Sequence, residues 1–154
     1  MNWSFGMIKP DGVSAKEEIF FKIKSRGLEI VLSRKIYLKE RQVKALYKRH
    51  LNKEFYSSMK EFLISGPVVV FVVKGKNAIQ KLNELVGFYD PKKAKKDTIR
   101  NQFGTDIQEN VIHSSYNQKD AIREVKIFLK AKNLKGGYNN PLFFYCYFLV
   151  KKYN

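Results

Sequence analysis

The chain has 154 residues, the size of one domain and too short for two ordinary ones. Hydrophobic residues make up 44% and charged residues 29% of it, which excludes collagen-like, low-complexity and wholly disordered proteins. Thirty Lys and Arg against fourteen Asp and Glu give a formal net charge of +16. Such a field attracts nucleotides, nucleic acid or anionic membrane surfaces without selecting among them.

Cysteine content and hydropathy favour a soluble protein of a reducing compartment. Cys146 is the single cysteine and cannot form an internal disulfide, and no Cys and His cluster has the spacing of a zinc site. The N-terminal segment has no basic and apolar leader, so we expect no signal peptide. The most apolar stretch, 141–150, is about half the roughly 20 residues that a membrane-spanning helix needs. We therefore expect a cytoplasmic protein without membrane contact.

Apolar periodicity in the first half of the chain predicts strands alternating with helices. The segment around Ile30, Leu32 and Ile36 alternates and is rich in β-branched residues, which is typical of a strand. Gly27 precedes it at the position of a left-handed helix cap. The predicted elements are a strand over 3–8, a turn over 9–12, a helix over 14–25, a strand over 28–38, and short helices over 43–50 and 54–63.

The second half completes the order β-α-β-(αα)-β-α-β-α. Residues 68–73 form a continuous apolar run, which suits a central strand covered on both faces. Residues 88–109 have no clear period, and irregular segments of this length are usually functional or mobile. A helix over 78–86, a short strand over 110–113 and a helix from 121 to 129 are also predicted. Because no dinucleotide-binding fingerprint connects the strands, we expect an α+β sandwich with helices on a small antiparallel sheet rather than a doubly wound fold.

The two histidines of the chain have different settings. His50 ends a predicted helix beside Lys48 and Arg49, where a surface or capping role is the better interpretation. His113 ends a short apolar segment, so a strand would deliver its side chain to the rim of a sheet. Taken alone, a histidine in such a place is more often structural than catalytic.

The position of Glu124 favours a catalytic role for His113. It lies in the row of side chains, between Ala121 and Phe128, that otherwise forms the apolar face of the last helix. A carboxylate buried there needs a partner, and His113 is the natural candidate. An imidazole oriented by a carboxylate can act as a nucleophile or a general base. In the alternative, Glu124 only borders the apolar face and reaches water beside Arg123, and periodicity does not decide between the two.

Cations suggest a phosphate ligand without proving one. Lys9 follows the first strand and precedes a rigid Pro-Asp-Gly turn, a better place to meet a ligand than that of most lysines. No G-x-x-x-x-G-K-[ST] string is present, so a Walker-type phosphate cradle is absent. Five further cations form either a solvated loop or a phosphate clamp: Lys92, Lys93, Lys95, Lys96 and Arg100.

Four strings, in order between about residues 3 and 130, together resemble the nucleoside diphosphate kinases. They are Met7-Ile-Lys-Pro-Asp-Gly-Val13, Ser65-Gly-Pro-Val-Val69, Thr98-Ile-Arg100 and Asn110-Val-Ile-His-Ser-Ser115. The resemblance implies a ferredoxin-like βαββαβ sandwich, whose four-stranded antiparallel sheet is covered by helices. It also implies ping-pong transfer of a γ-phosphate from a nucleoside triphosphate to a nucleoside diphosphate through a phosphohistidine, Mg²⁺ carried by the nucleotide rather than by a metal site of the protein, and a homo-oligomer, either a tetramer or a hexamer.

The resemblance also assigns roles by motif position. His113 would be phosphorylated and Glu124 would orient it, in agreement with the argument from the helix row, and Lys9 would complete the catalytic set. Phe55 would stack on the base, which tolerates any base. The nucleotide-binding positions would be Lys9, Tyr47, Phe55, Arg100, Asn110 and Ser115, the last beside the catalytic histidine.

Several positions depart from the family pattern. Asn83 stands where a second phosphate-binding arginine is usual, and Tyr89 stands where a threonine is expected. An Arg-Gly pair and about two residues are missing after the Lys9 turn, and the histidine string reads His113-Ser-Ser-Tyr116. Lysines over 92–96, or Lys81, are candidates to replace the lost arginine. The alternative function is therefore a nucleotide- or nucleic-acid-binding family member with weak or lost kinase activity.

The resemblance divides the chain into two segments. Residues 1–137 are predicted to form the kinase-like domain. Residues 138–154 form an aromatic C-terminal extension that does not align with the family's end. We expect this extension to pack on the domain or to serve in assembly, because exposed apolar patches of this kind rarely go unused.

Overall fold

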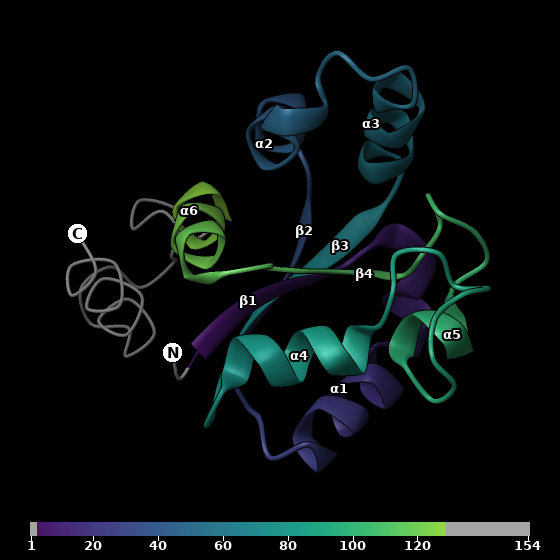
Figure 1. Ribbon diagram of the computed structural model, residues 1–154. Helices are drawn as coiled ribbons and strands as arrows, with labels where there is room; N and C mark the ends of the chain where they lie inside the picture. The colour runs from purple at the N-terminus through teal and green to yellow at the C-terminus, as the bar shows by residue number, and fades with distance from the viewer. Residues whose placement is uncertain (1–2, 129–154) are drawn as a thin grey trace.

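Four strands form one antiparallel sheet in the order β2-β3-β1-β4 in the computed structural model, which describes residues 3–128 (Figure 1). The inner strands are β1 and β3, which confirms the prediction of a central strand over 68–73. The strand bounds are Trp3–Ile8 for β1, Glu29–Tyr37 for β2, Pro67–Lys74 for β3 and Ile112–Ser114 for β4.

Helices cover both faces of the sheet. In Figure 1, α2, α3 and α6 lie on one side and α1, α4 and α5 on the other. This βαββαβ arrangement confirms the ferredoxin-like sandwich. The helices are α1 (Lys16–Ser25), α2 (Glu40–Leu46), α3 (Tyr56–Ile64), α4 (Ala78–Val86), α5 (Ile99–Phe103) and α6 (Gln118–Phe128), with 3₁₀ helices over Pro10–Ala15 and Lys48–His50.

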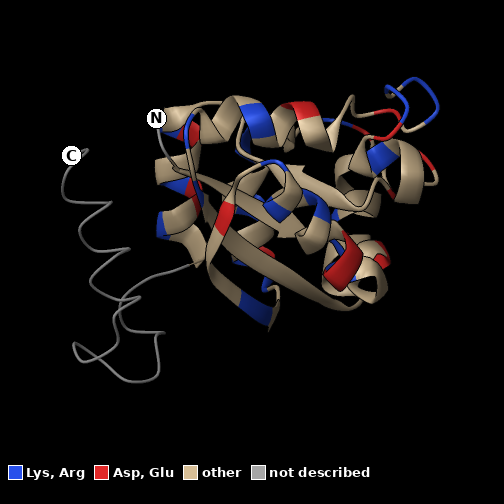
Figure 2. Ribbon diagram, turned by 90° about the horizontal axis from the view of Figure 1, so that it is seen from below, with Lys and Arg blue, Asp and Glu red and all other residues tan. Residues whose placement is uncertain are grey.

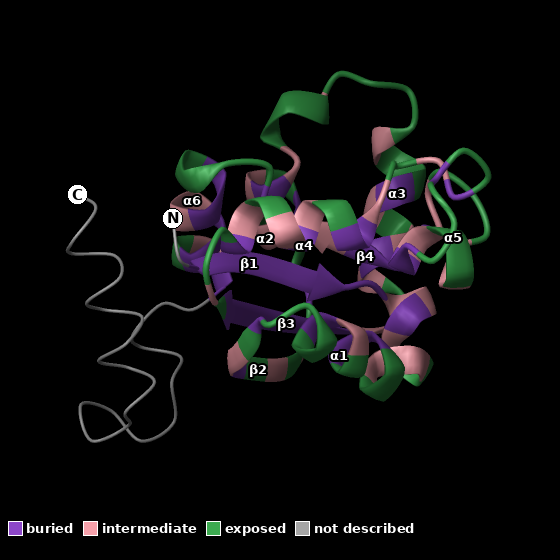
Figure 3. Cartoon of the chain, turned by 60° about the horizontal axis from the view of Figure 1, so that its bottom comes forward, coloured by how far each residue is buried: buried purple, intermediate pink, exposed green. Residues whose placement is uncertain are grey.

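The continuous apolar run of β3 contributes side chains to two hydrophobic cores, one on each face of the sheet. Because side chains of a strand alternate in direction, Val70 packs under α2, α3 and α6 while Phe71 packs against α1 and α4. Figure 3 shows both inner strands as buried ribbons between the helices. A strand with two covered faces needs apolar residues at every position, which explains why alternation is absent from this segment.

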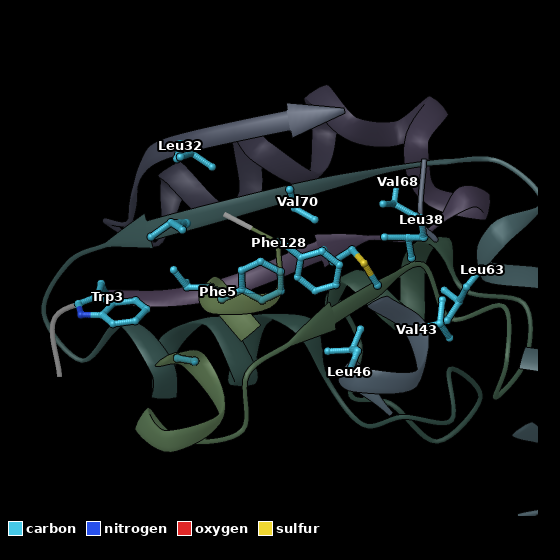
Figure 4. Packing of buried hydrophobic residues seen from close by; sticks show 14 of the residues in the cluster. Trp3, Phe5, Leu32, Leu38, Val43, Leu46, Leu63, Val68, Val70 and Phe128 are labelled. Carbon is cyan, nitrogen blue, oxygen red and sulfur yellow. The ribbon is translucent and has the colours of Figure 1, made fainter. Parts of the chain in front are cut away.

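The C-terminal helix α6 is fixed to the sheet by aromatic contact. The rings of Phe5 and Phe128 stack with centroids 5.3 Å apart and 5° between planes, and Figure 4 shows them side by side in the core. Burying an aromatic side chain of this size stabilises a fold by about 1.5–3 kcal/mol. This contact sets the position of α6, and with it the position of Glu124.

Two local predictions are corrected by the structure. The helix predicted from residue 14 begins earlier, as a 3₁₀ helix from Pro10, because proline fixes its φ near the helical value at the first position. The segment 88–109 is not wholly irregular, since it contains α5. With only five residues, α5 is too short to show a helical period, although Thr98 caps it by accepting a hydrogen bond from Asn101 N at 3.4 Å.

Gly6 of β1 should be intolerant of a side chain. A Cβ at this position would overlap the ring of Phe71, which is fully buried on the neighbouring strand. We expect Gly6→Ala to lower the free energy of unfolding by about 1–3 kcal/mol, measured by urea denaturation. Gly66→Ala is the control, because a Cβ there approaches nothing closer than 3.4 Å. Equal denaturation midpoints for the two variants would contradict this account.

Part of the sequence-based prediction lies beyond the described residues. The domain end at 137, the aromatic extension over 138–154 and Cys146 all fall outside residues 3–128. Within that range, no helix is both long enough and apolar enough to cross a membrane.

Candidate active site

His113 lies on the edge strand β4, opposite Met7 of β1, and lines a cavity of about 220 Å³. Ser115 and Glu124 are buried beside its ring and outside this cavity. The cavity, called here the His113 cavity, brings together six residues that the sequence singled out: Lys9, Tyr47, Phe55, Arg100, Asn110 and His113.

Glu124 of α6 contacts one nitrogen of the His113 ring. Nε2 of His113 lies 3.0 Å from Glu124 Oε2, and Ser115 Oγ donates a hydrogen bond to the same oxygen at 2.5 Å. The Glu124 side chain is 2% exposed, so it does not reach water as in the solvated alternative. Arg123 does accompany it, donating from Nη2 to Glu124 Oε1 at 3.2 Å.

These contacts determine which nitrogen of His113 is available. Both oxygens of Glu124 accept hydrogen bonds from fixed donors, so we assign the remaining N–H donor to His113 Nε2. Nδ1 then carries the lone pair. Because the side chain of His113 is 20% exposed, a ligand in the cavity can reach that nitrogen.

Arg123 joins α6 to α2 behind the site. Its guanidinium donates to the carbonyls of Ala45 and Leu46 at 2.9 and 3.3 Å and to Asp120 Oδ1 at 3.2 Å. Sequence reasoning treated Arg123 only as a solvated neighbour of Glu124. Arg123 holds α6 against α2 through carbonyls that lie some 77 residues away in sequence. Periodicity within α6 does not reveal contacts over this distance.

Lys9 is a buried cation at the floor of the His113 cavity. It is 5% exposed, and Nζ donates to Asn110 Oδ1 at 2.7 Å and to the Gln108 carbonyl at 3.1 Å. Burial, together with a smaller effect of the nearby Arg100, lowers the pKa of its ammonium group to about 8. The neutral amide of Asn110 positions Lys9 without cancelling its charge, which leaves that charge for an anionic ligand.

Arg100 of α5 supplies a second cation. Nη1 donates to the Gly87 carbonyl at 2.9 Å and Nη2 to the Ile112 carbonyl at 2.8 Å, while the buried Nε has no hydrogen-bond partner among residues 3–128. Burial lowers the pKa of the guanidinium to about 10. Burial also raises the pKa of the Tyr47 hydroxyl well above its usual value, so Tyr47 stays protonated and can donate. The cavity therefore combines two cations with a hydroxyl donor, a set suited to phosphate.

The mouth of the cavity is aromatic and apolar. Phe55 is 50% exposed, and its ring centroid lies 5.6 Å from that of His50. His50 is exposed, as its interpretation as a surface residue predicts, and it also lines the same cavity as His113. Ile107 also lines the mouth and is 59% exposed. No sequence signal marked Ile107, because an isolated isoleucine in an irregular segment has no distinctive pattern.

The Lys9 turn is locked against the start of β4. Val111 adopts a positive φ of 72°, a strained conformation for a β-branched residue. Its N–H donates to Asp11 Oδ2 at 3.0 Å, and its carbonyl accepts from Lys9 N at 2.7 Å. Gly12 lies so close that a Cβ would overlap the Val111 side chain. These contacts hold Lys9 and His113 in a fixed relative position.

Asn83, which replaces the usual arginine, and Lys81, a candidate to compensate for it, both lie outside the His113 cavity. Asn83 Oδ1 accepts from Ser114 Oγ at 2.6 Å and Nδ2 donates to the Ser115 carbonyl at 3.0 Å, so Asn83 supports the end of β4 and does not line the His113 cavity. Lys81 donates to the Arg26 carbonyl at 3.3 Å, outside the site.

Tyr89, which replaces the expected threonine, and Lys92, another candidate to replace the arginine, lie closer to the site. Tyr89 lines the His113 cavity, and Lys92 lines an adjoining hollow of about 480 Å³ that shares Lys9, Phe55 and Ile107 with it. Figure 2 shows the lysine-rich segment 92–96 as a blue loop at the edge of the molecule. Lys92 is therefore better placed than Lys81 to replace the usual arginine.

A model of the family described as "Nucleoside diphosphate kinase" matches residues 2–134. Curated relatives with this name include one from Archaeoglobus fulgidus, 38% identical over 130 residues that cover 83% of this chain and 86% of the relative. Another, from Thermobifida fusca, is 41% identical over 124 residues that cover 79% of this chain and 92% of the relative.

Solved structures agree with the sequence comparisons. An apo nucleoside diphosphate kinase from Encephalitozoon cuniculi superposes with a TM-score of 0.80 at 30% identity, covering 84% of this chain and 89% of that one. A halophilic nucleoside diphosphate kinase from Halobacterium salinarum, solved in complex with CDP, gives 0.80 at 29% identity, with coverages of 86% and 90%. On the match of its sequence and its fold, and with three of the four strings contributing residues to the His113 cavity, the chain belongs to the nucleoside diphosphate kinase family.

Proposed function

We propose that this protein transfers the γ-phosphate of a nucleoside triphosphate to a nucleoside diphosphate through a phosphohistidine at Nδ1 of His113. The observation that carries the proposal is the 3.0 Å contact between His113 Nε2 and Glu124 Oε2 beside a cavity lined by two cations, the buried Lys9 and the half-buried Arg100. Membership of the kinase family and the complex of a relative with CDP support a nucleotide as the ligand.

The first half-reaction needs only a nucleophile and well-placed charges. The base lies between Phe55 and Ile107, and the phosphates extend toward Lys9 and Arg100. The lone pair of His113 Nδ1 forms a bond to the γ-phosphorus while the bond from that phosphorus to the β,γ-bridging oxygen breaks, releasing the diphosphate. The proton stays on Nε2, where the Glu124 carboxylate stabilises the positive charge that develops on the ring. The second half-reaction reverses these steps with another diphosphate.

Mg²⁺ is proposed to enter with the nucleotide. Residues 3–128 contain no group of three or more His, Cys, Asp or Glu able to hold a metal ion, and the His113 cavity is lined by no carboxylate. The donor set therefore fits a metal–nucleotide complex, with Lys9, Arg100 and Tyr47 meeting the phosphates. The ion would neutralise charge on the phosphate oxygens. The homo-tetramer or hexamer and the cytoplasmic location stay predictions, which sedimentation velocity and cell fractionation test.

The proposal is tested by labelling. Incubation with a nucleoside triphosphate carrying ³²P at the γ position should produce a protein label that is acid-labile and base-stable. Adding an unlabelled nucleoside diphosphate should then discharge the label into triphosphate. The alternative, a nucleotide- or nucleic-acid-binding relative without transfer, predicts binding of the triphosphate with no label.

Lys9 should make nucleotide binding depend on pH. Because its pKa in the free protein is about 8, Lys9 loses its charge as the pH rises through this value, whereas a bound phosphate favours the charged form. We expect the affinity for a nucleoside diphosphate to fall by up to about tenfold per pH unit above pH 8, with proton uptake on binding. Calorimetry between about pH 7.5 and 9.5, in buffers of different ionisation enthalpy, measures both effects. Lys9→Arg, whose guanidinium does not titrate here, should flatten the profile, and an unchanged slope in this variant would refute the assignment.

A further inference from the structure

A second cavity, of about 560 Å³, adjoins His113 between α6 and the end of α2 with the 3₁₀ helix Lys48–His50 that follows it. In Figure 1, α2 and α6 lie side by side on one face of the sheet. We call this second cavity the α2–α6 cavity. It shares only Tyr47, His50 and His113 with the His113 cavity. The ring of Tyr47 lies 6.1 Å from that of His113 and 6.2 Å from that of His50, so these three rings form the partition between the two spaces.

The two carboxylates of the α2–α6 cavity, Asp120 and Glu124, are already hydrogen-bonded. Asp120 accepts hydrogen bonds from Arg123 at 3.2 Å and from the Asn117 amide at 3.1 Å. Glu124 accepts from Ser115 and Arg123 and contacts His113. Each oxygen of both carboxylates therefore has a partner, and the four Lys and Arg side chains of the lining outnumber its two carboxylates.

Three cations of the lining remain for a ligand. Among residues 3–128, the side chains of Lys48 and Lys119 make no hydrogen bond or ion pair, and both line the cavity. Arg49 reaches Asp120 only at 4.0 Å with a side chain that is 78% exposed, which makes a weak pair. These cations come from the 3₁₀ helix after α2 and from α6, so they flank the cavity rather than one surface helix.

We propose that the α2–α6 cavity binds an inorganic di- or triphosphate, such as pyrophosphate, beside His113 and independently of the nucleotide. Its volume lies in the range of about 300–1,000 Å³ that is usual for small-molecule sites. A compact anion with several charges can contact Lys48, Arg49 and Lys119 together, and the exposed Tyr116 hydroxyl adds a donor at the rim.

The position of this anion has a consequence that rests on the proposed function. His113 lines both cavities, so an anion in the α2–α6 cavity lies near the ring that becomes phosphorylated. Repulsion between the two anionic groups then slows phosphohistidine formation. Because the anion does not occupy the His113 cavity, more nucleotide does not relieve this inhibition.

Calorimetric titration of pyrophosphate tests the site without relying on kinase activity. Because pyrophosphate can also occupy the phosphate site of the His113 cavity, the titration is run with a nucleoside diphosphate saturating the protein, and we expect one pyrophosphate to bind per chain under these conditions. Lys48→Ala/Lys119→Ala should weaken this binding about tenfold or more. Lys24→Ala/Lys76→Ala removes the same net charge from exposed positions elsewhere and should change it about twofold or less. Circular dichroism confirms that both variants fold.

Three results would overturn the proposal: no binding of pyrophosphate, loss of binding once nucleoside diphosphate is saturating, or equal weakening in both double variants. In the labelling assay, pyrophosphate should slow the labelling of the parent protein and leave Lys48→Ala/Lys119→Ala unaffected. Equal inhibition of the two would also count against the α2–α6 cavity. Absence of any label would instead reject the proposed kinase function, while the calorimetric result would still decide on the anion site.

Discussion

Replacing His113 with alanine is expected to abolish phosphoryl labelling completely. The imidazole is the only group of the His113 cavity, within residues 3–128, that combines a free ring nitrogen with a carboxylate partner at hydrogen-bond distance. Removing it removes the nucleophile rather than one of several stabilising contacts, so no partial rate is expected. The measurement is incorporation of ³²P from the γ position into protein at saturating triphosphate, with nucleotide binding checked by calorimetry.

His50→Ala is the matched control for His113→Ala. Both substitutions remove an imidazole from the lining of the same cavity, but His50 contacts the rings of Tyr47 and Phe55 and has no carboxylate partner among the described residues. We expect this variant to keep its label and to bind nucleotide a few-fold more weakly, because it loses a neighbour of Phe55. Labelling that survives in His113→Ala, or that disappears in His50→Ala, would remove His113 from the proposed role.

The fold was largely predictable because its elements have clear periods. The apolar run over 68–73 indicated a strand buried on both faces, and β3 does contribute side chains to both hydrophobic cores. The helix α5 was missed since five residues cannot show a 3.6-residue repeat. That omission matters for the site, because α5 carries Arg100 and directs its guanidinium to the Gly87 and Ile112 carbonyls.

The candidate site was predictable where a motif or a misplaced charge marked it. Glu124 was visible as a carboxylate in an apolar helix row, and the structure brings it to His113. The place of His50 in the cavity lining was not predicted, because its contacts with Tyr47 and Phe55 depend on the turn between α2 and α3, which no spacing rule describes. The support that Arg123 gives to Glu124 was missed for the same reason, since it relies on α2 carbonyls.

The structure also changes what is expected of Asn83. From sequence alone, Asn83→Arg is predicted to strengthen diphosphate binding, because a guanidinium matches phosphate better than an amide does. The structure adds an opposing effect, since the substitution breaks hydrogen bonds to Ser114 and to the Ser115 carbonyl beside the catalytic strand. Titrating a diphosphate against Asn83→Arg and against Lys92→Ala shows which cation source the phosphate site uses.

Glu124→Gln should slow phosphohistidine formation about a hundredfold while leaving nucleotide affinity within a few fold. The substitution keeps the size of the side chain and removes its charge. As the His113 ring becomes positive on phosphorylation, the neutral amide stabilises it less than the carboxylate does. Lys9, Arg100 and the mouth of the cavity do not contact Glu124, so binding is largely preserved. Single-turnover labelling at saturating triphosphate separates the two effects.

The surroundings of Glu124 make this prediction specific. One oxygen of Glu124 accepts from Ser115 and contacts His113, so the amide oxygen of glutamine is needed on that side. Its NH₂ group then faces the Arg123 guanidinium, a donor opposite a donor, and we expect some loss of stability as well. Glu84→Gln, at an exposed position of α4 where Gln80 donates to the carboxylate, is the matched control and should change neither rate nor stability. If Glu124→Gln folds and labels at the parent rate, the carboxylate only braces α6, and His113 must be oriented by other contacts.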